Sequence, residues 1–492
     1  MMEIKSSCAN HRHMGRLFVA TYFIAFIISK YVGFSLGYAL DDYIVTSKAN
    51  ADSLIHLFLS QGRFSFAIVQ HLLTTTNLSM SDFHTIALVG ISLFSGLMFS
   101  SMLNAPECDN PLTIISIASL LGTYPYFAEY VSFHQAALPM ALMFLFLWLS
   151  FDNYSKWVKH SFHGAMHPAI VVIFAVIAAG FNQLAFSFLC IGLLVFTAQR
   201  VTTPLGSPKS KWWMPFYTSA CGGIAVGIPY LLVAYIVRIV YGVPSDARAT
   251  MLSVADMPER VNQVLGLVIK IFIEKEPIVS VAAKAALLIS LLAVAVFTSA
   301  ARLRNTAYTL SIFVTAIGLA LLPIAISGTW WPVPRTLIAV PFAFAGAILL
   351  LSREQARWRS LVSFVALSIA SLLFTAHSNA ILTNQLRLNR WDLSTARDIF
   401  TAASQRFPEE TGGIVLNDPK WSYPAAPGIA DGDLNVSALS IGWAAKPVFK
   451  EATGRDVNVR TSTDFTNECS AKGIFPAGTS LFVHGDEVVV CM

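Results

Sequence analysis

Two adjacent carboxylates, Asp41 and Asp42, directly follow the first long apolar segment of the chain, in the stretch Tyr38-Ala39-Leu40-Asp41-Asp42-Tyr43. Charges at membrane depth are costly and commonly mark a functional site. An acidic pair here can bind a cation, relay protons or act as a catalytic base. The alternative is an acidic cap for a helix that follows outside the membrane. We favour a functional pair. The other segments of the chain must then position these two side chains.

The composition is that of an integral membrane protein. Hydrophobic residues make up 55% of the 492 residues and charged residues only 12%, whereas soluble domains carry about 25% charged residues. The net charge of +5 is modest and its basic residues lie in short loops, which argues against a nucleic-acid partner. The six cysteines form no Cys-x-x-Cys pair and no His/Cys cluster, so no zinc site is predicted.

Eleven apolar segments predict membrane-spanning helices, since about 20 helical residues cross a bilayer. Lys and Arg concentrate in alternate short loops, which predicts a cytoplasmic N-terminus with an uncleaved signal anchor and an outer C-terminus. The two long outer loops, 39–82 and 241–276, contain short apolar helices expected to lie at the membrane interface. Lys30, inside the first span, is expected to extend its ammonium group to the outer interface. The predicted spans are 17–38, 83–103, 111–127, 135–151, 168–181, 184–199, 215–240, 277–299, 308–327, 336–351 and 361–376.

The composition changes near residue 377, which predicts a transmembrane domain over 1–376 and a small α/β domain over 377–492 on the outer face. In the second domain, residues 392–406 have helical periodicity. Two short apolar runs flank Gly485-Asp486, which predicts a two-residue β-hairpin. Cys469 and Cys491 are the only cysteines of this domain. An oxidising compartment would allow them to pair, and the alternative is two buried thiols.

The residues able to do chemistry gather on the predicted outer side. ATP and nucleotide sugars are cytoplasmic, and the chain has neither a P-loop nor a GxGxxG fingerprint. An outward-facing enzyme therefore needs an activated donor that crosses the membrane, such as a polyprenyl-phosphate sugar. Arg at the interface would bind the phosphate, and a carboxylate would take the proton from the attacking acceptor hydroxyl.

At this point the sequence resembles a family. A long outer loop with an acidic pair after the first span, many further spans and an outer C-terminal domain resemble the GT-C superfamily of lipid-linked-sugar glycosyltransferases. More narrowly, Leu40-Asp41-Asp42-Tyr43 with Gln61-Gly62-Arg63-Phe64 is similar to the serotype-converting O-antigen glucosyltransferases. The motifs cover the first 80 residues or so, and the remainder resembles the family only in architecture.

The resemblance implies a GT-C-like polytopic helical fold in a bacterial inner membrane, with the active site and C-terminal domain in the periplasm. It implies inverting transfer of a glucosyl group from polyprenyl-phosphate-glucose to O-antigen repeats of lipopolysaccharide. Asp41 or Asp42 would be the base, and the sequence leaves open which of the two. No metal and no other cofactor is expected. A donor-making glycosyltransferase and a flippase are the expected functional partners.

Three arginines are candidates for binding the donor phosphate, namely Arg63, Arg248 and Arg335. Arginine suits this role because its planar guanidinium group presents several donors to phosphate oxygens. Arg63 has plainer alternatives, since it could anchor an interfacial helix among lipid headgroups or pair with Asp42.

Four further outer residues are candidates for binding the acceptor or the sugar. Glu129 and His134 could bind the acceptor or support the acidic pair, or they could be ordinary wetted loop residues. Trp330 and Trp331 could stack on a sugar ring, but an interfacial aromatic belt explains them as well.

The main alternative function is a transporter or flippase for lipid-linked sugar or polysaccharide. It would predict charges midway along several spans, inverted repeats and interrupted helices. The sequence has one Lys within a predicted span, no clear repeat, and one segment that glycines and a proline could interrupt, 222–229. An acyltransferase would need a His/Asp site supplied with acyl-CoA from inside, and a scaffold would not explain the acidic pair. We therefore favour glycosyl transfer.

Overall fold

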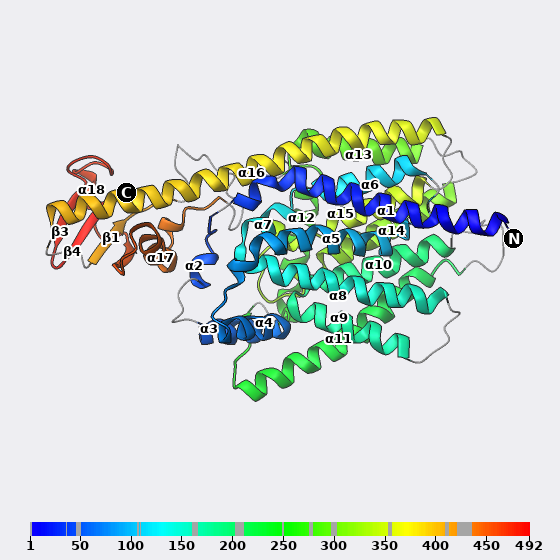
Figure 1. Ribbon diagram of the computed structural model, residues 1–492, viewed down its shortest axis with the longest axis horizontal. Coiled ribbons are helices and arrows are strands. Elements are labelled where there is room, and N and C mark those ends of the chain that lie inside the picture. The colour runs from blue at the N-terminus through cyan, green and yellow to red at the C-terminus, as the bar shows by residue number, and fades with distance from the viewer. Residues whose placement is uncertain are drawn as a thin grey trace. The chain divides into compact units, whose positions relative to one another are not determined.

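The computed structural model describes residues 2–35, 37–45, 51–105, 108, 110–159, 166–201, 211–247, 250–274, 279–296, 303–352, 357–408, 413–420 and 435–492. Within these residues the protein is mostly helical, with one small sheet near the C-terminus (Figure 1). The chain divides into two compact units. The first consists of Met1–Tyr31, Ser53–Tyr130 and Ala136–Ser378, and the second of Val32–Asp52, Val131–Gln135 and Asn379–Met492.

The second unit differs from the predicted C-terminal domain in one respect. Its main segment begins at Asn379, close to the predicted boundary at residue 377. However, it also takes in Val32–Asp52 and Val131–Gln135, two segments that the sequence prediction assigned to the domain over 1–376, mostly to its outer loops. The acidic pair therefore belongs to the same compact unit as the C-terminal sheet.

The first unit is a bundle of apolar helices, of which α1 and α5 are seen running alongside each other in Figure 1. The helix α10 is central, because it packs against α5, α9, α11, α14 and α15 and almost all of its residues are buried. The helices are α1 (Met2–Lys30), α3 (Ala51–Ser60), α4 (Phe64–Thr75), α5 (His84–Met102), α6 (Pro111–Thr123), α7 (Phe127–Ser132), α8 (His134–Lys159), α9 (Met166–Phe181), α10 (Leu184–Val201), α11 (Met214–Tyr241), α12 (Met257–Phe272), α13 (Val281–Val296), α14 (Leu303–Ile326), α15 (Val340–Ser352) and the start of α16 (Arg357–Arg406).

Seven helices in the described part of the chain are long and apolar enough to span a membrane, so the protein is polytopic but the predicted count of eleven is not reached. The helices α6 and α15 are apolar but have only 13 residues each. At a rise of 1.5 Å per residue they measure about 20 Å, less than the hydrocarbon core of about 30 Å. The seven are His13–Ser35, Met80–Met102, His134–Val158, Leu184–Val201, Met214–Tyr241, Thr306–Ile326 and Ser360–Arg406.

The short helix α6 can end inside the bundle because other side chains bind its last carbonyl groups. The Lys30 ammonium donates to the Gly122 carbonyl oxygen at 2.8 Å, and the Ser378 hydroxyl donates to that of Thr123 at 3.1 Å. These carbonyls have no partner within the helix, and a cation at a helix C-terminus is favourable. Lys30 is 0% exposed, so the prediction that it extends to the outer interface is wrong.

Two further buried cations bind helix ends in the same way. The Arg260 guanidinium, on α12, donates to the carbonyl oxygens of Ile324 and Ser327 at 2.9 and 2.6 Å, where α14 ends. The Lys284 ammonium, on α13, donates to the carbonyl oxygen of Lys270 near the end of α12 at 2.6 Å. These charges are therefore explained by helix capping.

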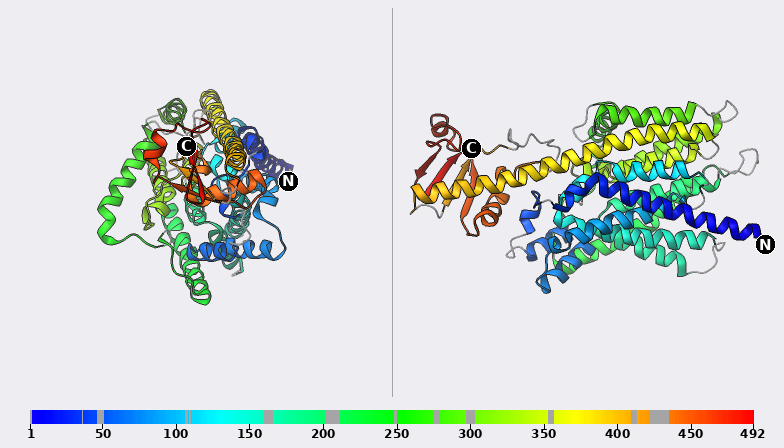
Figure 2. Two further views of the ribbon diagram at one scale, coloured as in Figure 1. Left: turned by 90° about the vertical axis from the view of Figure 1, so that its left-hand side faces the viewer. Right: turned by 45° about the horizontal axis from the view of Figure 1, so that its top comes forward.

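The helix α16 runs without a break from Arg357 to Arg406, a length of 50 residues (Figure 2). The sequence prediction treated 361–376 as a span and 392–406 as a separate helix, and this separation is wrong. The uninterrupted helix has a local cause, because the 50 residues contain neither proline nor glycine. Its later part, from Asn379 onward, belongs to the second unit.

The second unit contains a four-stranded sheet in the order β2-β1-β4-β3. Strand β1 is parallel to both β2 and β4, whereas β3 and β4 form an antiparallel hairpin. Gly485, in the two-residue turn of this hairpin, has a φ of +64°, which glycine adopts readily. The predicted hairpin is therefore confirmed. The elements are β1 (Gly413–Asn417), α17 (Gly442–Thr453), β2 (Asn458–Ser462), α18 (Thr466–Ser470), β3 (Leu481–His484) and β4 (Glu487–Cys491).

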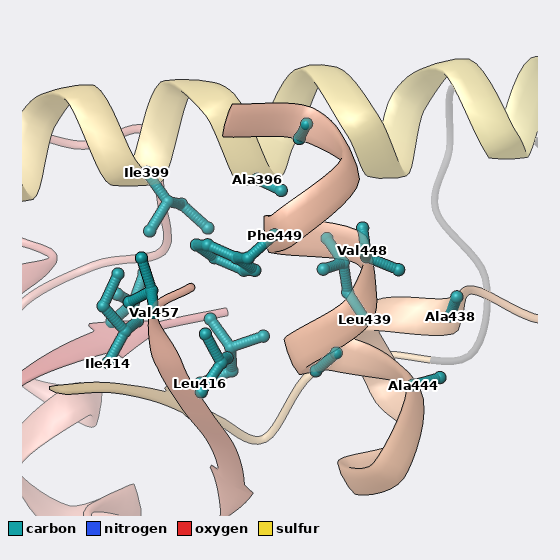
Figure 3. Packing of buried hydrophobic residues seen from close by; sticks show 14 of the residues in the cluster. Ala396, Ile399, Ile414, Leu416, Ala438, Leu439, Ala444, Val448, Phe449 and Val457 are labelled. Atoms are coloured by element: carbon teal, nitrogen blue, oxygen red, sulfur yellow. The ribbon is translucent and has the colours of Figure 1, made fainter. Parts of the chain in front are cut away.

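One face of this sheet carries the main core of the unit. Because side chains alternate along a strand, Ile414 and Leu416 of β1 point to this face, where they meet Ala396 and Ile399 of α16 (Figure 3). Helix α17 adds Val448, Phe449 and other apolar side chains to the same cluster.

The opposite face of the sheet has a smaller cluster. Val415 and Val489 pack there against Phe465. Beside this cluster, a disulfide joins Cys469 of α18 to Cys491 of β4, with an S–S distance of 2.05 Å. The cysteine pair that the sequence singled out is thus bonded in the structure, and it fixes α18 to the central part of the sheet.

Candidate functional site

Asp42 lies at the start of the short helix α2 (Asp42–Val45), and its side chain is only 1% exposed. Its Oδ1 accepts a hydrogen bond from the backbone N–H of Gln135 at 2.9 Å. Its Oδ2 accepts from the backbone N–H groups of Ala39 at 2.9 Å and His134 at 3.1 Å. His134 and Gln135 are the first two residues of α8, so Asp42 binds N–H groups that have no partner within that helix.

Two opposing effects act on the protonation of Asp42. Burial raises its pKa, as does the charge of Asp41, while the N–H groups of Gln135, Ala39 and His134 lower it; burial dominates, and the resulting pKa is about 7. A pKa near the working pH suits a general base, but a base must first reach the proton that it takes. Both oxygens of Asp42 are engaged by backbone donors and the side chain is buried. The geometry therefore makes Asp42 an anchor.

Asp41 differs from its neighbour in being only half-buried. It lies in the turn between Leu40 and Asp42, both of which are buried. Of the two carboxylates, Asp41 is therefore the more accessible to solvent. The sequence could not separate the two residues, because their types and positions are equivalent in the motif.

His134 lies beside the acidic pair, as one of its two predicted roles requires. Its contact with Asp42 uses the backbone N–H. Its imidazole ring packs edge to face against the Tyr38 ring, with 5.3 Å between the centroids, and Tyr38 packs in the same manner on Tyr43 at 5.8 Å. His134 is thus placed to support the segment that carries Asp41, whereas acceptor binding by its side chain stays a prediction.

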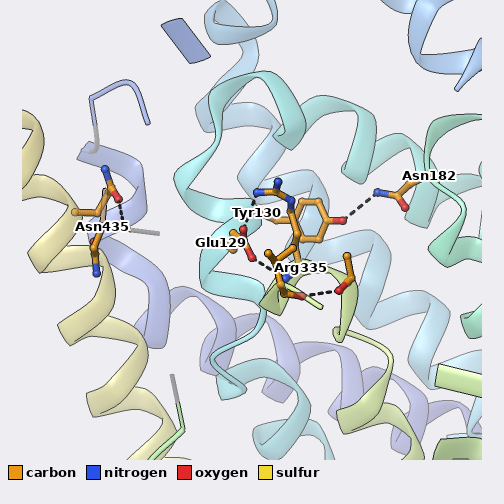
Figure 4. Close-up of polar contacts among 8 residues, drawn as sticks. Glu129, Tyr130, Asn182, Arg335 and Asn435 are labelled. Carbon is orange, nitrogen blue, oxygen red and sulfur yellow. Dashed lines mark hydrogen bonds and ion pairs between the residues drawn. The ribbon is translucent and has the colours of Figure 1, made fainter. Parts of the chain in front are cut away.

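Glu129 and Arg335 form a buried ion pair in the first unit (Figure 4). Glu129, on α7, is 0% exposed. Its Oε1 accepts from Arg335 Nη1 and its Oε2 accepts from the Arg335 backbone N–H, both at 2.6 Å. The Arg335 guanidinium also lies over the Trp331 ring, 4.5 Å from its centroid. Three residues that the sequence treated as separate candidates therefore form one cluster.

Trp330 has a different partner. The guanidinium of Arg260 lies 5.2 Å from the centroid of its ring, and the same guanidinium binds the end of α14. Trp330 is therefore part of a helix-capping arrangement. Arg260 could not be singled out from the sequence, because an arginine on an amphipathic interfacial helix is expected to face solvent.

Tyr130, which the sequence analysis did not single out, lies near both Arg63 and Arg335. Burial raises the pKa of Tyr130 to about 12, and the positive charges of Arg335 and Arg63 oppose this shift. Its hydroxyl accepts a hydrogen bond from Asn182 Nδ2 at 3.0 Å (Figure 4). The charges of two of the three predicted phosphate-binding arginines thus act on a single phenol. In the sequence, only the position of Tyr130 directly after the candidate Glu129 could have identified it.

The turn that carries Arg63 is held by the neighbouring helices. Gln183 Nε2 donates to the carbonyl oxygen of Gln61 at 2.6 Å and to the Tyr230 hydroxyl at 3.1 Å. Gly62 has a φ of +76°, where glycine carries no steric penalty. Gln183 therefore has a definite role in positioning Arg63. The third predicted arginine, Arg248, lies outside the described residues.

Among the described residues, no group of three or more His, Cys, Asp or Glu side chains is arranged to hold a metal ion. The expectation of a metal-free reaction stays a prediction. Comparisons with protein-family profiles, with curated proteins and with solved structures find no match to this chain. The case for a function therefore rests on the residues described above and on the motif-level resemblance of the first 80 residues or so.

Proposed function

We propose that this protein is a membrane glycosyltransferase in which Asp41 is the catalytic base. The donor would be polyprenyl-phosphate-glucose and the acceptor a hydroxyl group of an O-antigen repeat, on the periplasmic face of a bacterial inner membrane. One observation carries the proposal, namely the division of the acidic pair into a buried, hydrogen-bonded Asp42 and a half-buried Asp41. The hydrogen-bonded Asp42 fixes the backbone directly beside the proposed base, Asp41.

The chemistry requires few protein groups. Asp41 would accept the proton of the acceptor hydroxyl while its oxygen attacks the anomeric carbon of the sugar. The bond between that carbon and the phosphate oxygen breaks, and polyprenyl phosphate leaves with the electron pair. A single displacement of this kind inverts the configuration at the anomeric carbon.

Arg63 and Arg335 are proposed to bind the phosphate of the donor. Both positive charges act on Tyr130, which supports a common role of the two arginines within the first unit. Glu129 holds the Arg335 guanidinium in one orientation, and a fixed guanidinium group loses little entropy when it binds an anion.

The alternative of a transporter or flippase stays a prediction. Buried charges within a helical bundle are expected of transport pathways. Lys30, Arg260 and Lys284 are buried, but each binds the carbonyl groups at a helix end. These cations therefore have a structural explanation that requires no transported substrate.

The test is transfer of labelled glucose from synthetic polyprenyl-phosphate-glucose to purified O-antigen by the purified full-length protein. Asp41→Asn should lower kcat by about 100-fold or more with an unchanged KM for the donor. Asp398→Asn is the matched control, because Asp398 is an exposed carboxylate of the same unit; this variant should keep full activity.

Three results would refute the proposal in different ways. Full activity in Asp41→Asn, with loss of activity in a folded Asp42→Asn variant, would transfer the role of base to Asp42. Full activity in both variants would show that the acidic pair is not catalytic. An inactive wild type with several donor sugars would contradict glycosyl transfer itself, and flipping of the lipid-linked sugar in liposomes would then be measured.

A further inference from the structure

The segment that carries the acidic pair is part of the hydrophobic core of the C-terminal domain. Leu40 and Tyr43 are 6% and 1% exposed, and both belong to the cluster formed by α16, α17 and the sheet. The partly buried Tyr38 packs against the same cluster, and α2 packs on α17. Residues near position 40 thus complete a hydrophobic core whose other members lie beyond residue 378.

Hydrogen bonds fix the same segment at two further points. Asn389, on α16, donates from Nδ2 to the carbonyl oxygen of Tyr38 at 2.6 Å. The Tyr43 hydroxyl is hydrogen-bonded to the carboxylate of Glu451 on α17. Burial and the neighbouring charge of Glu451 hold the pKa of Tyr43 well above its usual value, so the hydroxyl stays protonated and donates.

These contacts lie on both sides of Asp41. Tyr38 is bound by Asn389, and Leu40 is buried in the core. On the other side, Asp42 is bound to the start of α8 and Tyr43 to Glu451. Since its neighbours along the chain are held, the backbone of Asp41 has little freedom. Its side chain is half-buried, whereas that of Asp42 is buried.

We propose that the C-terminal α/β domain positions the catalytic carboxylate, with Tyr43 and Glu451 as the positioning residues. The inference rests on the proposed role of Asp41. It assigns to the domain a function in catalysis that needs no binding of substrate by the domain itself. Misplacement of a catalytic group by about 1 Å can lower a rate by about 100-fold, so the loss of one anchoring bond should reach the chemical step.

The test compares three substitutions that leave the apolar core unchanged. Tyr43→Phe removes only the hydroxyl, Glu451→Ala removes the acceptor, and Glu451→Gln keeps an oxygen that can accept the hydrogen bond. For each variant of the full-length protein, kcat, KM, apparent Tm and hydrogen exchange of the backbone amides of residues 38–45 are measured. Lys450→Ala is the matched control, because Lys450 is an exposed neighbour of Glu451 on α17.

We expect Tyr43→Phe and Glu451→Ala each to lower kcat by about tenfold, with the KM for the donor within about twofold of the wild-type value. Hydrogen exchange of the backbone amides of residues 38–45 should become faster in both variants. Glu451→Gln should restore most of the rate, and the double variant Tyr43→Phe with Glu451→Ala should be no slower than either single variant, because both remove the same bond. A merely structural role would lower Tm without this pattern in kcat.

Failure of the inference can be distinguished from failure of the proposed function. An active wild type whose kcat does not change in Tyr43→Phe and Glu451→Ala would overturn the inference alone. Unchanged exchange of residues 38–45 in Tyr43→Phe would overturn it regardless of activity. A wild type that transfers no sugar from any donor would overturn the proposed function, and the positioning role with it.

Discussion

Replacing Asp42 by Asn should change how the stability of the protein depends on pH. In the folded protein, burial raises the pKa of Asp42 from 3.8 to about 7. Between about pH 4 and pH 7 the folded state therefore holds a proton on Asp42 that the unfolded state has lost. Because stability falls with rising pH wherever the folded state binds more protons, Asp42 stabilises fully below about pH 4 and loses this contribution as the pH rises to about 7.

The magnitude follows from the size of the shift. A difference of about 3 pKa units corresponds to about 4 kcal/mol, at 1.36 kcal/mol for each unit. Asn is neutral and contributes no such titration. Its amide also replaces one acceptor oxygen by a donor, which leaves a buried backbone N–H of Ala39, His134 or Gln135 without its partner, at a cost of about 1–3 kcal/mol.

The assay is thermal unfolding of the purified protein at a constant scan rate, followed by intrinsic fluorescence from pH 4 to pH 8. We expect the apparent Tm of the wild type to fall across this range by several degrees more than that of Asp42→Asn. Asp398→Asn, which alters an exposed carboxylate of the same unit, should follow the wild type.

An equal dependence on pH in the wild type and Asp42→Asn would refute this reasoning. A Tm that rises with pH in the wild type but not in Asp42→Asn would refute it in a different way. It would show that the N–H groups at the start of α8 stabilise the ionised carboxylate more than burial destabilises it.

Two further predictions concern single contacts. Arg335→Met should lower the stability of the first unit by about 3–5 kcal/mol, because it removes the charged partner of the buried Glu129 carboxylate. The double variant with Glu129→Met should recover most of this loss. A double variant that is as unstable as Arg335→Met in thermal unfolding would contradict this view of the pair. Replacing Cys469 and Cys491 by Ser should cost about 3 kcal/mol, since the disulfide closes a loop between residues 22 positions apart; a wild-type Tm that does not change with a reducing agent would argue against this contribution.

Several elements could be predicted from the sequence because they depend on neighbouring residues. The apolar runs form helices at the predicted places, and the turn Gly485-Asp486 joins two strands whose alternation was visible in the sequence. Within the described residues, seven helices are long enough to span where eleven were predicted. For α6, the sequence does not show where the carbonyl groups of a short helix find donors. The donors for α6, Lys30 and Ser378, come from distant parts of the chain.

The candidate site shows the same division. The sequence located the acidic pair, and it identified Glu129, Arg335 and Trp331 as residues of interest. It could not show that the last three bind one another, since Glu129 and Arg335 are 206 positions apart. The sequence also could not show which of Asp41 and Asp42 is buried.

The sequence by itself therefore determined that this is a membrane protein with an acidic pair after its first apolar helix, because composition and periodicity are local properties. Only the tertiary structure decided that Asp42 is buried and that Asp41 is half-buried. That difference arises from hydrogen bonds to residues 92 and 93 positions away and from a core shared with the C-terminal domain. Contacts of this kind depend on how distant segments pack, which no local pattern of residue types specifies.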